Sequence, residues 1–228
     1  MRCCIFGAGD YRGELLYLTE GAFVIAADAG YRHLASYGLS PALTVGDFDS
    51  LGAPPAAGEV LCHPVMKDDT DMALAAEEGL ARGCDEFWLF GGMGGRPDHT
   101  LANLSLLLSL TKRGCRAYLA GREGVFTALA GGSLLFESSC RGTLSVFSAG
   151  ERAEGVTLEN LLYPLSQYTL VHDRALGVSN RFIGREARIS LLSGALYVFW
   201  EDLGNPFPRY LPFPEDGAGK NPSGKNGE

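Results

Sequence analysis

Short apolar runs alternate with helix-like stretches throughout the first half of this chain of 228 residues. Repeated alternation of strand and helix predicts a doubly wound, mostly parallel, Rossmann-like sheet with right-handed crossovers. The expected strands lie at residues 2–8, 23–27, 42–45, 60–65, 86–90 and 116–119. The expected helices lie at residues 11–18, 31–37, 71–81 and 97–112, and Thr70 stands where an N-cap is needed.

From about residue 125 the pattern changes to short β-rich runs separated by glycine. These runs fall at residues 133–137, 143–148, 168–172, 187–192 and 195–200. They predict an antiparallel β-sandwich. We therefore expect an α/β domain over residues 1–124, a β-sandwich domain over residues 125–203 and a flexible tail over residues 204–228.

Acidic side chains are concentrated in two short segments. Asp47 and Asp49 flank Phe48, and Asp71 ends the run Lys67-Asp68-Asp69-Thr70-Asp71. Residues two apart in an extended segment point to the same side, so the carboxylates of Asp47 and Asp49 would repel each other. A divalent cation turns this repulsion into attraction, and sites with few carboxylates commonly hold magnesium on substrate phosphates. Asp47, Asp49 and Asp71 therefore predict a Mg²⁺ site and phosphate chemistry.

Polar or glycine-rich loops follow four of the predicted strands. These loops begin at Asp28 and at residues 46, 67 and 91. In a doubly wound sheet ligands bind beyond the carboxyl ends of the strands, so the four loops should converge on one edge. The glycines of residues 91–95 allow close backbone approach to an anion, and Arg96 adds a cation. Turn formation and helix capping are the simpler alternatives for these same residues.

The charge and hydropathy of the chain limit its partners. The net charge is −8 and no long Lys/Arg run occurs, which argues against a nucleic-acid partner. No apolar run approaches the roughly 20 residues that cross a bilayer, and the N-terminal segment does not resemble a signal peptide. The sequence therefore predicts a cytoplasmic protein without a membrane partner.

Several motifs, taken in order, resemble those of bacterial thiamine pyrophosphokinases. They are Asp28-Ala29-Gly30, residues 46–50, residues 67–71, residues 94–99 with Asn103, and Gly177-Val178-Ser179-Asn180. The resemblance implies an α/β nucleotide domain and a β-sandwich that binds thiamine. It also implies Mg²⁺-assisted transfer of a diphosphoryl group from ATP to the hydroxyl of thiamine, giving thiamine diphosphate and AMP.

The same resemblance implies a homodimer and a role for individual residues. The thiamine pocket would join the first domain of one subunit to the second domain of its partner. The implied magnesium ligands are Asp47, Asp49 and Asp71. The implied nucleotide or thiamine contacts are Asp28, Lys67, Asp68, Thr70, Arg96, Asp98 and Asn103, with Ser179 and Asn180 reaching the neighbour's thiamine. Asp71 or Asp28 is expected to accept the proton of the thiamine hydroxyl. Together with the magnesium ligands Asp47 and Asp49, these two residues make up the expected catalytic group.

Two other functions stay open on the sequence alone. A metal-dependent nucleotide-sugar transferase would explain Asp47 and Asp49, but not the run from Lys67 to Asp71 or Arg96. A non-catalytic thiamine or nucleotide sensor of the same fold would have little need of an acidic metal site. Arg181 alone keeps the sensor open as an alternative, because bacterial members of the family commonly carry Glu at this position.

Overall fold

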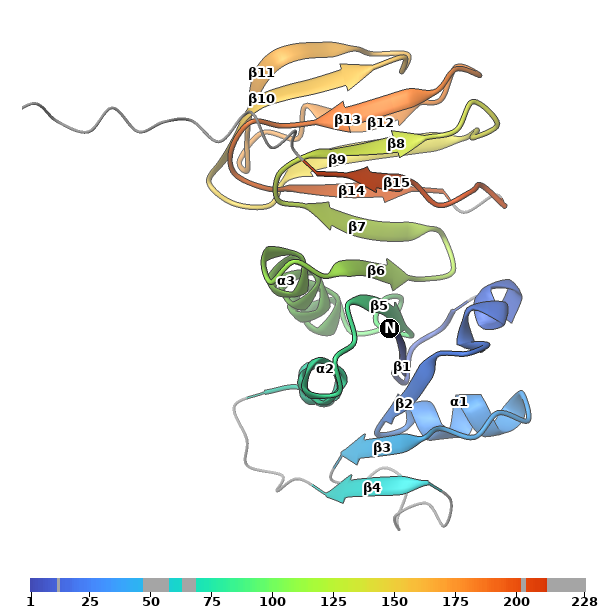
Figure 1. Ribbon diagram of the computed structural model, residues 1–228. Helices are drawn as coiled ribbons and strands as arrows, with labels where there is room; N and C mark the ends of the chain where they lie inside the picture. Colours follow the sequence, from blue (N-terminus) through green and yellow to red (C-terminus); the bar gives the residue numbers. More distant parts are fainter. Residues whose placement is uncertain (12, 47–57, 63–68, 202–203, 213–228) are drawn as a thin grey trace, which may run out of the picture.

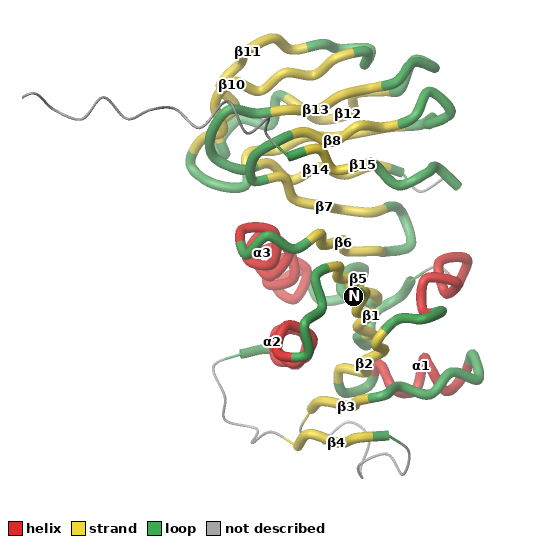
Figure 2. The backbone as a smooth tube through the Cα atoms, in the orientation of Figure 1, coloured by secondary structure: helices red, strands yellow, loops and turns green. Residues whose placement is uncertain are grey.

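The computed structural model describes residues 1–11, 13–46, 58–62, 69–201 and 204–212 (Figures 1 and 2). The first half contains β1 (Arg2–Phe6), the 3₁₀ helix η1 (Gly13–Thr19), β2 (Phe23–Ala27), α1 (Gly30–Ser36), β3 (Leu43–Gly46), β4 (Glu59–Cys62), α2 (Asp71–Ala81), β5 (Glu86–Phe90), α3 (Pro97–Lys112) and β6 (Arg116–Ala120). The second half contains β7 (Val125–Leu129), β8 (Ser133–Phe136), β9 (Thr143–Ser148), β10 (Arg152–Glu159), β11 (Leu165–Val171), β12 (Gly177–Arg181), β13 (Ala187–Ser190), β14 (Leu196–Trp200) and β15 (Arg209–Leu211).

A ten-stranded sheet runs through most of the molecule, in the order β12-β9-β14-β7-β6-β5-β1-β2-β3-β4. The six strands from β6 to β4 are parallel, as the alternating pattern predicts. Its buried strands carry apolar residues on both faces: Cys3 and Ile5 of β1 enter one core, and Cys4 and Phe6 enter the other.

Helices cover both faces of the parallel part, which confirms the α/β class. α2 and α3 pack on one face of the sheet (Figure 1). Their residues Met72, Ala75 and Leu107 join the core on that face. η1 and α1 pack on the other face through Leu15 and Leu34. None of the helices in the described ranges is long and apolar enough to cross a membrane.

The strands after residue 124 do not form a β-sandwich separate from the parallel strands, because four of them belong to the ten-stranded sheet. β7 pairs with β6, and β14, β9 and β12 continue the same sheet. The other layer is a five-stranded sheet in the order β11-β10-β13-β8-β15. The expected boundary at residue 124 falls in the turn between β6 and β7, and hydrogen bonding continues across it. The division into two domains at this point stays a prediction.

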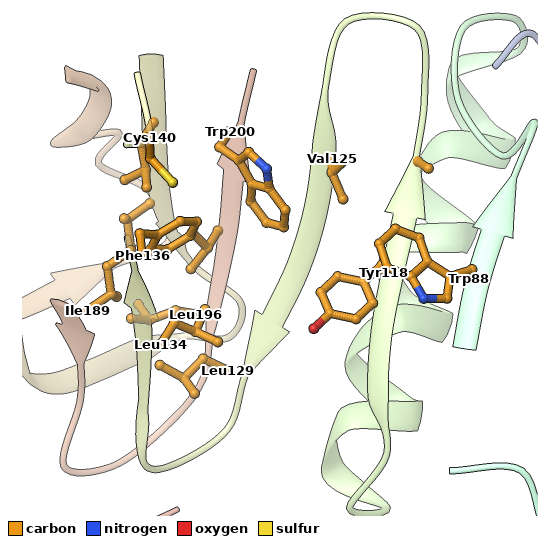
Figure 3. Packing of buried hydrophobic residues seen from close by; sticks show 14 of the residues in the cluster. Trp88, Tyr118, Val125, Leu129, Leu134, Phe136, Cys140, Ile189, Leu196 and Trp200 are labelled. Carbon is orange, nitrogen blue, oxygen red and sulfur yellow. The ribbon is translucent and has the colours of Figure 1, made fainter. Parts of the chain in front are cut away.

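One hydrophobic core spans this boundary. Trp88 and Tyr118 of the parallel strands stack with their ring centroids 4.3 Å apart. Tyr118 in turn meets Trp200 of β14 edge to face at 6.5 Å, and Trp200 meets Phe136 of β8 at 5.5 Å (Figure 3). Because these rings are in contact, the two halves of the chain bury each other's apolar surface.

The predicted flexible tail is wrong for its first residues. β15 pairs with β8 at the edge of the five-stranded sheet. Upstream of it, Phe207 packs on Trp88 with a centroid distance of 4.5 Å, and the Asn205 side chain bonds the backbone of Arg141. The prolines at positions 206, 208 and 212 lie outside β15, so none of them removes a backbone donor from this strand. Residues 213–228 lie outside the described residues.

Candidate active site

A pocket of about 320 Å³ opens at the carboxyl ends of β1, β2 and β5. The strand order reverses at this place, since the chain runs from β1 through β4 on one side and returns to β5 on the other. Ligands of open α/β sheets bind in the crevice at such a switch point. The first turns of α2 and α3 close the pocket and direct backbone N–H groups toward it.

The floor of the pocket is made of glycine backbone. Gly7 N–H donates to the Phe90 carbonyl at 2.8 Å, and Gly9 N–H donates to the Gly91 carbonyl at 2.9 Å. Gly91 has a φ of 65°, and a Cβ there would lie 2.6 Å from the Gly9 oxygen. Only glycine allows the loops after β1 and β5 to approach this closely.

Asp28 stands directly after β2 in the left-handed conformation, with a φ of 45°. Its backbone N–H donates to the Val45 carbonyl at 2.8 Å, and a Cβ on Gly46 would lie 3.2 Å from the Asp28 Cα. The chain therefore leaves β3 beside Asp28. Strained non-glycine residues of this kind are concentrated at functional sites.

Asp71 begins α2, and Thr70 is the N-cap of that helix as predicted. The Thr70 hydroxyl accepts a hydrogen bond of 3.2 Å from the Ala73 N–H. Both residues line the pocket, as does the glycine-rich loop. The cap fixes where the helix starts and thereby where the Asp71 carboxylate is displayed.

Arg96 and Asp98 are paired at the start of α3. The Arg96 Nε and Nη2 atoms donate to the two Asp98 oxygens at 3.2 and 2.6 Å, and both side chains are exposed. This contact lowers the pKa of Asp98 and raises the pKa of Arg96. A fork of guanidinium donors that fits a carboxylate also fits a phosphate.

Asn103 lies one turn further along α3 and is buried. Its Nδ2 donates to the Gly92 carbonyl at 2.9 Å, which ties the helix to the glycine-rich loop. A Cβ on Gly92 would lie 2.9 Å from this Nδ2 atom. Asn103 thus supports the loop as well as lining the pocket.

The predicted residues are only partly brought together. The pocket gathers Asp28, Thr70, Asp71, Arg96 and Asn103. Asp47, Asp49, Lys67 and Asp68 lie outside the described residues. Within the described ranges no three His, Cys, Asp or Glu side chains form a metal-binding group. The carboxylates of Asp28 and Asp71 nevertheless supply hard oxygen donors, the ligand type that suits Mg²⁺.

Ser179 and Asn180 lie far from this pocket in the same chain. They belong to β12, which is separated from β5 by β9, β14, β7 and β6. Five strand spacings correspond to roughly 24 Å. The two residues therefore cannot meet a ligand bound in the pocket of their own chain.

Other pocket residues were missed by sequence reasoning, among them Gly7, Gly9, Met72 and Met93. His99 also lines the pocket. The segment Gly7-Ala8-Gly9 directly after an apolar strand was the available signal for the first two. The methionines carried no signal, because their pattern is that of ordinary core residues.

The sequence of this chain is similar to proteins of known family. A model described as the thiamin pyrophosphokinase catalytic domain matches residues 15–119, and one described as its vitamin B1 binding domain matches residues 135–196. Thiamine pyrophosphokinase of Bacillus subtilis is 28% identical over 187 residues, covering 79% of this chain and 87% of that protein.

Solved structures agree with the sequence matches. The thiamine pyrophosphokinase structure from Bacillus subtilis has a TM-score of 0.78 and 27% identity, covering 89% of this chain and 100% of the other. A thiamin pyrophosphokinase family protein from Enterococcus faecalis has the same TM-score and identity, with coverage of 89% and 99%. Because both component domains match in order and together span most of the sequence, the chain belongs to the thiamine pyrophosphokinase family of enzymes.

Proposed function

We propose that the pocket at the switch point is where this chain transfers a diphosphoryl group from ATP to the hydroxyl of thiamine. AMP and thiamine diphosphate are the products. The observation that carries the proposal is the meeting of Asp28, Asp71 and Arg96 around a glycine floor at this pocket, in a chain of this family. A nucleotide-sugar transferase and a non-catalytic sensor are not favoured by the family.

The glycine-rich walls suit the polyphosphate. Backbone N–H groups at the start of α3 and the open loop around Gly94 and Gly95 allow phosphate oxygens to approach closely. Arg96 would exchange its contact with Asp98 for a phosphate oxygen. Such transfer depends on in-line positioning and charge neutralisation more than on covalent chemistry by the protein.

The acidic residues suit a magnesium site. Asp71 and Asp28 line the pocket, and Gly46, which lies beside Asp28, precedes Asp47 and Asp49 in the sequence. We assign Asp47, Asp49 and Asp71 as the ligands, with Lys67 and Asp68 as nucleotide contacts. A bound divalent ion would neutralise charge on the phosphate oxygens. An Oδ atom of Asp71 or Asp28 would accept the proton of the thiamine hydroxyl as it attacks.

The thiamine end of the site needs a second subunit. Because Ser179 and Asn180 are roughly 24 Å from their own pocket, they serve the pocket of a partner in a homodimer. An apolar surface around β12 supports this association. Its exposed side chains are Leu162, Tyr163, Leu176, Val178 and Ile183.

The test is a product assay on the purified chain with ATP, thiamine and MgCl₂. Mass spectrometry is expected to show AMP and thiamine diphosphate in equal amounts, and EDTA is expected to abolish both. AMP without thiamine diphosphate would indicate another acceptor. Release of ADP in place of AMP would contradict transfer of a diphosphoryl group.

A further inference from the structure

The edge strand β12 contains a bulge opposite a buried serine. Gly177 pairs with Val146 and Asn180 pairs with Leu144. Between these pairs β12 has two residues, Val178 and Ser179, where β9 has only Ser145. An extra residue in one strand bends it and changes the direction of its side chains, which is why bulges recur near binding sites.

Ser179 is held in an unfavourable conformation at this bulge. Its φ is 60°, in the left-handed region that a non-glycine residue rarely occupies. The hydroxyl of Ser145 accepts a hydrogen bond of 3.0 Å from the Ser179 N–H. Ser145 is only 6% exposed, while the Ser179 side chain is exposed. The buried serine therefore fixes the backbone of an accessible one.

The residues on either side restrict the bulge further. Asn180 is 3% exposed, and its carboxamide both accepts from the Tyr163 N–H at 2.9 Å and donates to the Tyr163 carbonyl at 2.7 Å. A Cβ on Gly177 would lie 2.3 Å from the Val146 oxygen. The bulge is thus anchored before and after Ser179.

We propose that Ser145 is a positioning residue for thiamine binding, acting through Ser179. It holds the left-handed bulge so that the Ser179 hydroxyl faces the pocket of the partner subunit. Asn180 has the same positioning role, since its carboxamide is engaged by the Tyr163 backbone. This inference rests on the proposed function, because it takes thiamine as the molecule that Ser179 meets.

Steady-state kinetics of the full chain test the coupling between the two serines. Ser145→Ala is expected to raise the KM for thiamine about fivefold, the effect of one lost hydrogen bond, with kcat and the KM for ATP unchanged. Ser145→Thr keeps the hydroxyl and is expected to restore the KM. Ser179→Gly also raises the KM for thiamine. Adding Ser145→Ala to it should then have no further effect, because Ser145 acts only through Ser179.

The matched control is Ser133→Ala, a buried strand serine of β8 that should leave all constants unchanged. If Ser145→Ala does not fold, Ser145→Cys fills the site with a slightly larger side chain and weakens the acceptor, so it provides the same comparison. If the double variant raised the KM for thiamine by the product of the two single effects, the inference would be overturned and the proposed function would stay intact. An unchanged KM for thiamine in Ser179→Gly would overturn the Ser179 contact and the inference together.

A structural readout is independent of turnover. A crystal structure of Ser145→Ala is expected to show Ser179 with a negative φ and its side chain redirected. Retention of the left-handed bulge without the Ser145 hydroxyl would overturn the positioning role, whatever reaction the enzyme performs.

Discussion

The two aspartates described in the pocket are held by different backbone devices. Asp28 is fixed by its left-handed conformation at the end of β2, and Asp71 by its place in the first turn of a capped helix. In both cases the backbone, and not the carboxylate, holds the residue in place. The carboxylate of Asp71 can therefore be changed without removing the element that carries it.

We predict that Asp71→Asn lowers kcat at least about a hundredfold, because the residue is assigned to the metal and the proton transfer. The melting temperature should fall by no more than a few degrees, since only a favourable charge at the helix start is lost. Product formation and thermal unfolding measure the two effects. Asp69→Asn, an exposed neighbour outside α2, is the control and should stay active. If Asp71→Asn unfolds, the Asp71 carboxylate has a structural role and the functional assignment is wrong.

Single residues were predictable where the signal is local. Thr70 is recognisable as an N-cap because a threonine precedes an alanine-rich helix. Gly7 and Gly9 were missed because their importance comes from contact with Gly91, which is distant in the sequence. The only local sign of these glycines is their position directly after an apolar strand, because a glycine has no side chain whose chemistry could indicate a role.

At the scale of elements, one glycine allows α1 to cross the end of β1. A Cβ on Gly30 would lie 1.8 Å from the Phe6 carbonyl oxygen. Gly30→Ala must therefore move the helix away from the strand, and we predict a loss of about 1 to 3 kcal/mol in the free energy of unfolding. Urea unfolding measures it. Gly150→Ala, where an added Cβ meets nothing within 4 Å, should be nearly neutral. Equal urea midpoints for Gly30→Ala and Gly150→Ala would contradict this account.

A charged group joins the amino ends of β1, β5 and β6. The Glu86 carboxylate, 12% exposed, accepts from Arg2 Nε at 2.7 Å, Trp88 Nε1 at 3.0 Å and Arg116 Nη2 at 2.8 Å. Burial works against the charged form, but these hydrogen bonds and the two arginines outweigh it and lower the pKa of Glu86 below 4.5. The contribution to stability is therefore present above pH 4.5 and is lost as the pH falls through the pKa of the folded state.

We predict that Glu86→Gln destabilises the chain by about 1 to 3 kcal/mol at pH 7, because the arginines lose a buried charged partner. The difference from the unaltered chain should shrink as the pH falls below 4.5. Urea unfolding at several pH values tests this. A difference that does not change with pH would mean that packing, and not charge, is what the substitution removes.

Elements were predicted best where burial and periodicity agree. The ranges of β2, α2, β5, α3 and β9 match the expected ones residue for residue. The predicted helix at residues 11–18 is a 3₁₀ helix beginning at Gly13. β12 was not predicted as a strand, because Gly177, Ser179 and Asn180 have low strand propensity and its pairing with β9 decides the outcome.

At the scale of the whole molecule, the sequence indicated an α/β half and a β half but not their fusion. The continuation of the sheet depends on the pairing of β6 with β7 and on the antiparallel pairing of β14 with β7 and β9. The β6–β7 pair is a hairpin that the change of pattern near residue 125 hid, whereas β14 is distant in sequence from both β7 and β9, so no local pattern indicates its pairings. The shared core of Tyr118, Trp200 and Phe136 has the same origin.

Subunit mixing tests the proposed sharing of one site between two subunits. Asp71→Asn leaves Ser179 intact, and Ser179→Gly leaves the pocket intact. After subunit exchange at equal concentrations, heterodimers carry one complete site, so about a quarter of all sites should work at low thiamine. Differently tagged chains confirm the exchange. Activity no greater than the mean of the two separate variants would place Ser179 outside a shared site.

The unbroken sheet from β4 to β12 has a mechanical consequence. Hydrogen-bonded strands connect the pocket to the edge strand β12. The sheet has no break between these two places at which one part could turn against the other, so the distance between them is fixed. Substrate entry and product exit are then expected to rely on movement of loops, because a clamp-like closure of the chain would break hydrogen bonds between neighbouring strands.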